Sequence, residues 1–224
     1  MLTHHDQELA ALKDKLLTMA GHAETGVRNA IRALVDHDDE LARRVKQNDD
    51  VLDRLEMEID EMAIGLLSKA PLATDLRFIT MAMKISRDLE RVGDETTAIA
   101  KRVIELNAEP QLKPHVDIPR MMTMAMEMLD AALDAFVNRQ PDRARAVIPR
   151  DKDVDALNKQ LHRELSSFMV ENPANISRCL NLMTISRRLE RIADHATNIA
   201  EEVVFLHEGR DIRHGATELP KPPA

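Results

Sequence analysis

The sequence predicts an all-α protein made of two pseudo-symmetric, antiparallel three-helix bundles. Three observations predict this class: one helical segment occurs twice, apolar residues recur with the spacing of a helix face, and long segments contain no proline. The chain has 224 residues, of which 44% are hydrophobic, but it has no Trp, no Tyr and only four Phe. Leu, Ile, Val, Ala and thirteen Met must therefore fill the core, and such side chains suit close packing of helix on helix.

The repeat relates residues 83–106 to residues 183–206 at a constant offset of 100. Thirteen of the 24 aligned positions are identical. The shared apolar positions within each copy recur three, four or seven residues apart, which is the spacing of one face of an α-helix. A repeat of this length predicts that the chain folds as two related halves.

Each copy of the repeat carries the pattern Glu-x-x-x-Asp. The pairs are Glu90 with Asp94, and Glu190 with Asp194. Because four residues make about one helical turn, both carboxylates of a pair point to the same side of their helix. The repeat thus gives each half one helix with two acids on a single face.

The first half reads as three helices. No proline occurs before Pro71, and apolar stripes with helical spacing fill this part of the chain. A break at 37–38 separates two striped segments, and the first copy of the repeat forms a third. The predicted helices run from Thr3 to about 34, from about 41 to 67, and from about 75 to 107.

A proline-rich stretch at 110–119 divides the two halves. The second half follows the same plan, with a turn bracketed by Pro141 and Pro149 and a helix ended by Pro173. Its predicted helices cover about 120–138, 150–171 and 175–208. The predicted organisation is a first bundle over 1–109, a linker over 110–119, a second bundle over 120–208 and a loose tail over 209–224.

Two further acid pairs lie on the helices that precede the repeats. Asp49 and Asp53 match Asp151 and Asp155 at an offset of 102. These acids lie 18 and 22 residues before the proline of their half, and the acids of the repeat lie 17 to 23 residues after it. A helical hairpin that turns at each proline therefore places the two acid pairs of a half at the same height along their helices. The acids predicted to face one another are Asp49, Asp53, Glu90 and Asp94 in the first half, and Asp151, Asp155, Glu190 and Asp194 in the second.

Four facing carboxylates repel one another strongly unless cations are present. Ligation by oxygen alone suits magnesium, manganese, calcium or iron, and the absence of thiolate or imidazole partners argues against a structural zinc site. The sequence therefore predicts one multi-carboxylate metal site in each half.

The alternative to a metal site is a solvated acidic face. Arginines three or four residues away could neutralise the acids of the repeat; they are Arg87, Arg91, Arg187 and Arg191. Three acids that the duplication does not preserve are predicted to be surface charges: Asp50, Glu56 and Asp88, which become Lys152, Asn158 and Arg188.

The sequence gives little support for an enzyme. A carboxylate-bridged di-iron bundle needs Glu-x-x-His on two helices, and this pattern is missing. His195, which follows Asp194, is predicted to be a polar boundary residue rather than a ligand. No glycine-rich phosphate loop and no nucleophile elbow appears.

Composition and charge bear on location and partners. A net charge of -8 argues against nucleic-acid binding. No run of eighteen apolar residues and no signal peptide is visible, so the chain is predicted to be cytoplasmic. Cys179 is predicted to be a small buried hydrophobe. Exposed methionines of the fourth helix would suit a homodimer; the candidates are Met121, Met124, Met126 and Met128.

Residues 3–207 resemble the PhoU family. Two three-helix bundles with a doubled Glu-x-x-x-Asp are that family's hallmark, and LERIADHATNIAEEV at 189–203 is similar to its most recognisable motif. The resemblance implies a cytoplasmic regulator of phosphate homeostasis, accessory to the phosphate-specific ABC transporter, which represses the phosphate-starvation regulon. It implies two partners, the transporter's ATPase subunit and a phosphate-sensing histidine kinase, with membrane contact only through them.

The resemblance also implies divalent or trivalent metal ions (iron, magnesium or manganese), bound as multinuclear clusters on the eight acids named above. Ala98 stands where the second copy has Asn198, so the two halves need not bind metal equally. Two other interpretations stay open. A carboxylate-bridged metal-dependent enzyme would turn over a substrate, and a purely structural helical scaffold would be free of metal.

Overall fold

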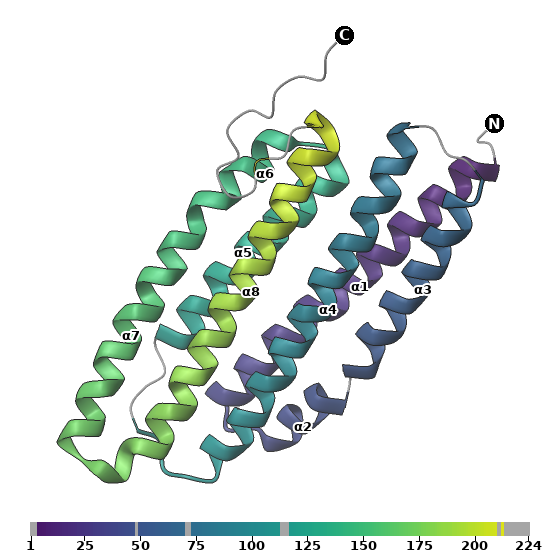
Figure 1. The fold of residues 1–224 in the computed structure, drawn as a ribbon. Coiled ribbons are helices and arrows are strands. Elements are labelled where there is room, and N and C mark those ends of the chain that lie inside the picture. The colour runs from purple at the N-terminus through teal and green to yellow at the C-terminus, as the bar shows by residue number, and fades with distance from the viewer. Residues whose placement is uncertain (1–3, 48, 70–72, 113–116, 210–211, 213–224) are drawn as a thin grey trace.

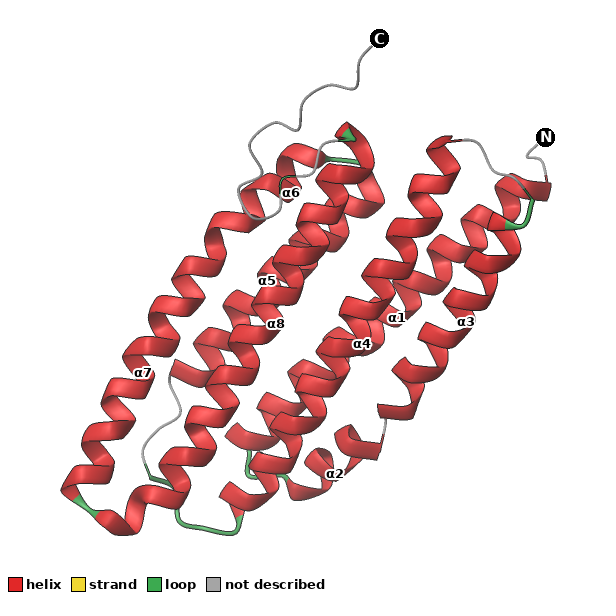
Figure 2. Ribbon diagram, viewed as in Figure 1, coloured by secondary structure: helices red, strands yellow, loops and turns green. Residues whose placement is uncertain are grey.

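The computed structural model describes residues 4–47, 49–69, 73–112, 117–209 and 212, and in these residues it contains helices and no strand (Figure 2). This confirms the all-α prediction. Three long helices form each half. Those of the first half are α1 (His4–Val35), α3 (Asp49–Leu67) and α4 (Ala73–Asn107). Those of the second half are α5 (Asp117–Asn138), α7 (Asp151–Glu171) and α8 (Ile176–Glu208).

Each half also has a short helix before its second long one, which the sequence does not separate. These are α2 (Asp39–Gln47) and α6 (Pro141–Val147), the latter followed by a 3₁₀ turn at Ile148–Arg150. Pro141 opens α6 at a position where the missing N–H costs no helical hydrogen bond. The same turn leads into both short helices, because His37 and Arg139, 102 residues apart, each adopt φ of 54°.

Several predicted boundaries fall on residues that the structure does not describe. They are Thr3 at the first N-terminus, Pro71 in the first hairpin, Pro114 in the linker, and all of the tail after 209 except Ile212. Helix α5, which is the fourth predicted helix, begins three residues earlier than predicted, at Asp117, so Pro119 lies in its first turn, where proline is tolerated.

Gly93 allows α3 and α4 to approach closely. A Cβ atom placed there would lie 2.4 Å from Cδ1 of Leu52, which is itself 6% exposed. A close helix contact therefore explains the glycine at this position. This contact sets the distance between the two helices that carry the acids of the first half.

The two halves pack mainly through α4 and α8, which run side by side in Figure 1, and less extensively through α1 and α5. One continuous apolar core extends through both halves. At one end the rings of Phe78 on α4 and Phe136 on α5 stack, with centroids 5.8 Å apart. The two halves are therefore packed against each other and are not joined by the linker alone.

The interface between α4 and α8 is called the seam below. Charged residues that differ between the two copies of the repeat pair across it. His195 Nδ1 lies 2.9 Å from Oδ1 of Asp88, and Arg188 Nη1 donates to Oε2 of Glu95 at 2.9 Å. Positions 88 and 188, like 95 and 195, are equivalent in the repeat, so each contact joins an acid of one half to a basic residue of the other. The prediction of Asp88 as a surface charge is wrong, because its side chain is 17% exposed and lies in the seam, as does Arg188, which is 33% exposed.

The methionines of α5 do not form an exposed surface. Met121, Met126 and Met128 are at most 1% exposed, and Met122 and Met124 pack partly buried against the core. The prediction of exposed methionine on this helix is wrong, because α1, α6 and α8 surround α5. Cys179 is buried as predicted. Among the described helices, none is long and apolar enough to cross a membrane.

Candidate functional site: paired carboxylate clusters

The acids of the second half come together between α7 and α8. Asp151 and Asp155 lie on successive turns of α7, and Glu190 and Asp194 lie on successive turns of α8. Burial raises the pKa of Asp151, and the negative charges of Asp194 and Asp155 raise it further. The pKa of Asp194 is raised by burial and then by Asp155. The register expected from the proline positions is thus present, and we call these four residues the second-half cluster.

Two oxygens of the second-half cluster are buried without a hydrogen-bond partner in the described part of the chain: Asp151 Oδ1 and Glu190 Oε2. Arg187 Nε lies 3.2 Å from the latter as an ion pair. Burial raises the pKa of Glu190; Arg187 opposes this shift, while Asp194 and a hydrogen bond with Asp155 add to it. Carboxylate oxygens left in this state are electrostatically suited to a cation.

The first half is more open and more strongly neutralised. Asp94 pairs with Arg91 Nη1 at 2.9 Å, and its side chain is 47% exposed. Glu90 lies deeper and is 16% exposed; burial raises its pKa, and the charge of Asp94 raises it further. Asp53 is exposed. Asp49 begins α3, but its side chain lies outside the described part of the chain.

Glu56 belongs to this first-half group, although the sequence predicts it to be a surface charge. It is half-buried, and its pKa is raised by burial and then by Asp60 and Asp53. It also raises the pKa of Glu90. The prediction is wrong because an acid that is absent from the second copy can still lie beside the other acids of its own half. A signal was available, because Asp53, Glu56 and Asp60 recur three and four residues apart on one helix face.

The residues that replace these acids in the second half form a hydrogen-bonded network. At an offset of 102, Glu56 becomes Asn158 and Asp60 becomes His162. Ser186 Oγ donates to Asn158 Oδ1 at 2.8 Å and lies 3.2 Å from His162 Nε2. The two halves thus share four acidic positions and differ beside them.

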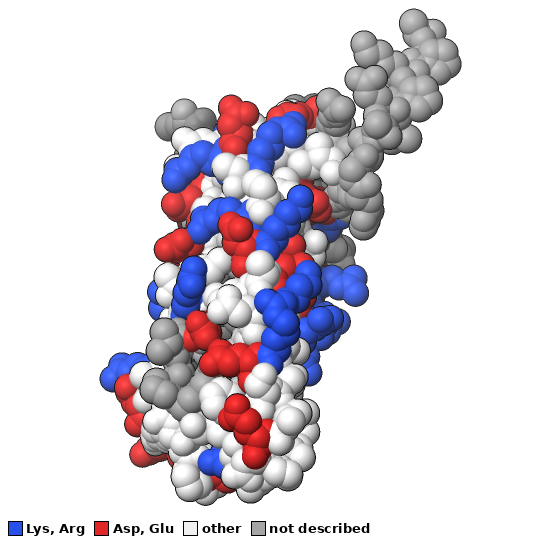
Figure 3. All heavy atoms as spheres, turned by 90° about the vertical axis from the view of Figure 1, so that its left-hand side faces the viewer, with Lys and Arg blue, Asp and Glu red and all other residues white. Residues whose placement is uncertain are grey.

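Arginines lie close to both groups of acids, as the alternative interpretation requires. Arg187 pairs with Glu190, and Arg91 lies 3.4 Å from Glu90. Arg191 instead pairs with Glu95 in the seam, at 3.1 Å. The face shown in Figure 3 carries acidic and basic side chains side by side. Partial neutralisation therefore explains how the acids coexist, but it leaves the buried oxygens of the second-half cluster without hydrogen bonds.

The fit of a metal ion can be judged from this geometry. Among the described side chains, no three His, Cys, Asp or Glu converge closely enough to hold one ion. The donors of the second-half cluster are nevertheless all oxygen, with two buried oxygens available and three raised pKa values. These residues fit a hard cation, provided that their side chains rotate toward one another.

Known proteins match both halves of this chain. A model of the PhoU domain matches residues 16–103 and again 118–203, one match in each half. A relative from Pseudomonas aeruginosa, named phosphate-specific transport system accessory protein PhoU homolog, is 41% identical over 226 residues, covering 97% of this chain and 93% of the relative. A relative of the same name from Aquifex aeolicus is 40% identical, covering 93% of this chain and 95% of the relative.

Two solved structures have the same fold. The crystal structure of PhoU from Pseudomonas aeruginosa matches with a TM-score of 0.88 and 40% identity, covering 92% of this chain and 99% of that one. The phosphate transport system regulatory protein PhoU from Streptococcus pneumoniae matches with a TM-score of 0.87 and 28% identity, covering 93% and 99%. These names are those of accessory and regulatory proteins, not enzymes, in agreement with the sequence prediction. With both halves matched by the domain model and the fold shared over nearly the whole length, the chain belongs to the PhoU family.

Proposed function

We propose that this chain is a regulatory accessory protein of a phosphate-specific ABC transporter and represses the phosphate-starvation regulon when phosphate is plentiful. In this role it contacts the transporter's ATPase subunit and a phosphate-sensing histidine kinase. The observation that carries the proposal is the agreement, over 97% of this chain, with a relative named as an accessory protein of phosphate-specific transport.

The carboxylate clusters support metal binding as part of this function. The second-half cluster and its first-half equivalents (Asp49, Asp53, Glu90 and Asp94) would hold iron, magnesium or manganese, as single ions or as multinuclear clusters. A bound cation would supply positive charge that lets neighbouring carboxylates ionise together. The protein's own contribution is to hold acids of two helices at one level, so that ligation joins α7 to α8 and α3 to α4.

A pull-down from the native cells tests the regulatory proposal. The tagged chain is recovered from cells grown in high phosphate, with crosslinking, and the co-purifying proteins are identified by mass spectrometry. The transporter's ATPase subunit and a histidine kinase should both be recovered. Deletion of the gene should raise expression from a phosphate-starvation promoter in high phosphate. Recovery of neither partner, together with unchanged promoter activity, would rule the proposal out.

Variants expressed in the same cells test whether regulation needs the carboxylate clusters or only the fold. Asp155→Asn removes one acid of the second-half cluster, and Asp153→Asn changes an exposed acid on the same helix. If metal binding serves regulation, only the first variant should raise promoter activity in high phosphate. Equal promoter activity in the two variants would show that regulation does not need the clusters.

We further propose that the chain acts in the cytoplasm as a homodimer and reaches the membrane only through its partners. Met57 and Ile64 support a self-association surface, because they lie seven residues apart on α3 and are 64% and 61% exposed. Sedimentation of the wild type and of Met57→Lys tests this: the wild type should sediment as a dimer and the variant as a monomer. A monomeric wild type at all concentrations would contradict the proposal.

A further inference from the structure

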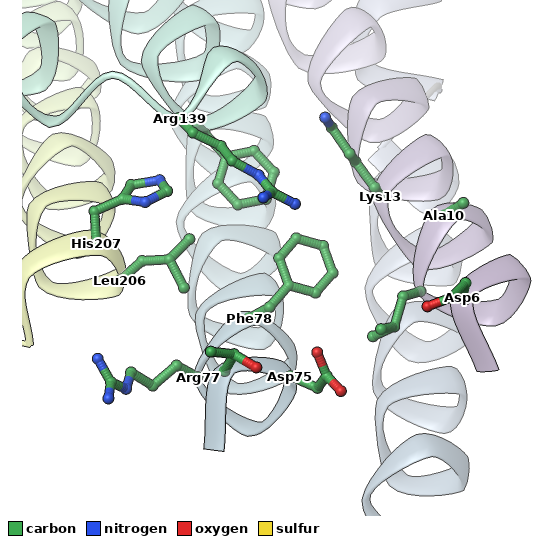
Figure 4. Close-up of a pocket in the computed structure, with 12 residues that line it drawn as sticks. Asp6, Ala10, Lys13, Asp75, Arg77, Phe78, Arg139, Leu206 and His207 are labelled. Carbon is green, nitrogen blue, oxygen red and sulfur yellow. The ribbon is translucent and has the colours of Figure 1, made fainter. Parts of the chain in front are cut away.

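A pocket of about 660 Å³ lies where four helix ends of the two halves meet. The beginnings of α1 and α4 and the ends of α5 and α8 form its walls (Figure 4). It is distinct from the carboxylate clusters, because Leu206 in its wall lies twelve residues beyond Asp194 on α8, about 18 Å along the helix. We call it the end pocket.

Aromatic rings form the centre of the end pocket. Phe78 from α4 and Phe136 from α5 line it and stack on each other, with an interplanar angle of 12°. Phe136 is buried, whereas Phe78 is half-buried and its ring lies in the middle of the view in Figure 4. The chain has only four Phe and no Trp or Tyr, so half of its aromatic side chains meet at this one place.

Basic side chains surround the rings. Arg77 and Arg139 line the end pocket. Lys13 donates to the carbonyl oxygen of Val137 at 3.0 Å, which holds its ammonium group near the end of α5. Figure 4 shows Arg139 and Lys13 on one side of the Phe78 ring.

A buried imidazole nitrogen also faces the end pocket. His207 lines the end pocket, and its Nε2 is buried without a hydrogen-bond partner in the described residues. Burial lowers the pKa of His207, and the positive charge of Arg139 lowers it further. An anion in the end pocket would relieve this repulsion and could accept a hydrogen bond from the imidazole.

Acidic side chains lie on the opposite side of the rings. Asp75 lies beyond Phe78 from Arg139 in Figure 4, with its Oδ2 3.2 Å from Nε2 of His5, and Asp6 lies nearby on α1. Figure 4 thus places Arg139 and Lys13 on one side of the Phe78 ring and Asp75 on the other, with Arg77 on the side of Asp75.

The second half has a different side chain at the position equivalent to Phe78. Position 78 corresponds to Arg178, whose guanidinium donates to the carbonyl of Pro110 at 2.9 Å and to Oδ1 of Asn175 at 2.6 Å. Arg178 also pairs with Glu109 at 3.6 Å. There a cation is held by groups of the protein itself, whereas the equivalent position in the first half is an aromatic ring with Arg77, Arg139 and Lys13 around it. Packing of the repeat does not by itself require the end pocket.

From this arrangement we propose that the end pocket binds a small organic phosphate, with a planar ring on Phe78 and the phosphate between Arg139 and Lys13. Guanidinium and phosphate match in geometry and charge, and rings of nucleic-acid bases stack on aromatic side chains. An amino group on the ring would face Asp75. The volume lies in the range of small-molecule sites. Nucleoside phosphates combine these features, and this inference goes beyond the proposed regulatory function.

Calorimetric titration of the full chain with AMP and with ATP tests the inference. At least one should bind saturably with one site per chain. Adenosine and inorganic phosphate should each bind about tenfold more weakly or worse, because each lacks one of the two contacts. Arg139→Ala should weaken nucleotide binding about tenfold, and Arg120→Ala, which removes an exposed arginine at the opposite end of α5, should leave it unchanged.

Two further variants keep the result interpretable. Phe78→Leu retains an apolar side chain but removes the ring, so the protein should remain folded and lose nucleotide affinity. Asp155→Asn, in the second-half cluster, should bind nucleotide as the wild type does, which separates this inference from metal binding. No saturable binding of AMP or ATP, equal affinity for inorganic phosphate, or wild-type affinity in Arg139→Ala would overturn it.

Discussion

Glu24 on α1 faces Asp130 on α5 across the two halves, close to Arg28 and Asp134. Burial raises the pKa of Glu24, and the charge of Asp130 and a hydrogen bond with it raise the value further, to about 7. The same physics acts in the carboxylate clusters, where burial and neighbouring acids raise the pKa of Asp151, Glu190 and Asp194. Several acids of this molecule are thus held in positions that disfavour their charged form.

A raised carboxyl pKa has a definite sign in stability. In the unfolded chain Glu24 titrates near 4.5, so between that pH and about 7 the folded protein holds the proton more tightly. Its contribution to stability is complete below pH 4.5 and is lost as the pH rises through 7.

Glu24→Gln should remove this loss. At pH 8 the variant should be more stable than the wild type by on the order of 1 kcal/mol, a figure reduced from the full linkage value because the group is only half-buried. The difference should be much smaller at pH 5 and should vanish only below pH 4.5. Urea unfolding at both pH values measures it, with Glu61→Gln, at an exposed acid on α3, as the control. A difference that is the same at pH 5 and pH 8 would contradict the account.

At the scale of elements, the spacing of α3 and α4 rests on Gly93. Gly93→Ala should destabilise the protein by about 1–3 kcal/mol, because the new methyl group would meet Leu52 at 2.4 Å and force the two helices apart. Gly21→Ala is the matched control, since nothing lies within 4 Å of its added Cβ. The control should be stabilised by about 0.5–1 kcal/mol. Thermal or urea unfolding compares the two, and equal stabilisation would show that Gly93 is not a packing constraint.

The helices themselves follow from the sequence, but some of their boundaries do not. Apolar periodicity and the prolines predict the long helices, because burial of one face favours those spacings. The division between α2 and α3 is missed because no proline or glycine marks it, and the same apolar stripe continues through residues 39–67.

The candidate site is predictable only where both halves repeat it. The proline register brings Asp155 level with Glu190, as the structure shows. Glu56 and Asp88 are missed because a residue that differs between copies looks like a surface substitution. The role of Asp88 depends on which helix of one half faces the other, and spacing within a single helix carries no information about that.

At the scale of the whole molecule, the seam between α4 and α8 is held by exchanged charges. Glu95 is 4% exposed and pairs with both Arg188 and Arg191. Pairing α4 with a second α4 would instead set Asp88 against Glu95, and pairing α8 with a second α8 would set Arg188 against His195. The departures from the repeat therefore favour association of unlike halves.

A double-mutant cycle tests the seam. Arg188→Gln should cost about 1–3 kcal/mol, because it leaves the buried Glu95 with fewer partners. Adding Glu95→Gln should recover part of that loss, since the buried charge is then gone. Arg120→Gln, at an exposed arginine, should change stability little. Additive effects of the two seam substitutions in urea unfolding would show that they do not interact.

The measurement that bears most directly on the carboxylate clusters is the metal content of the purified chain. Wild type, Glu90→Ala/Asp94→Ala and the exposed-acid control Asp153→Asn are equilibrated with manganese or iron, dialysed, and analysed by mass spectrometry of the metals, with helical content followed by circular dichroism. The double variant should hold about half the metal of the wild type with unchanged helical content, and the control should match the wild type. Unchanged metal content in the folded double variant, or a wild type that binds none, would contradict the presence of a metal site in each half.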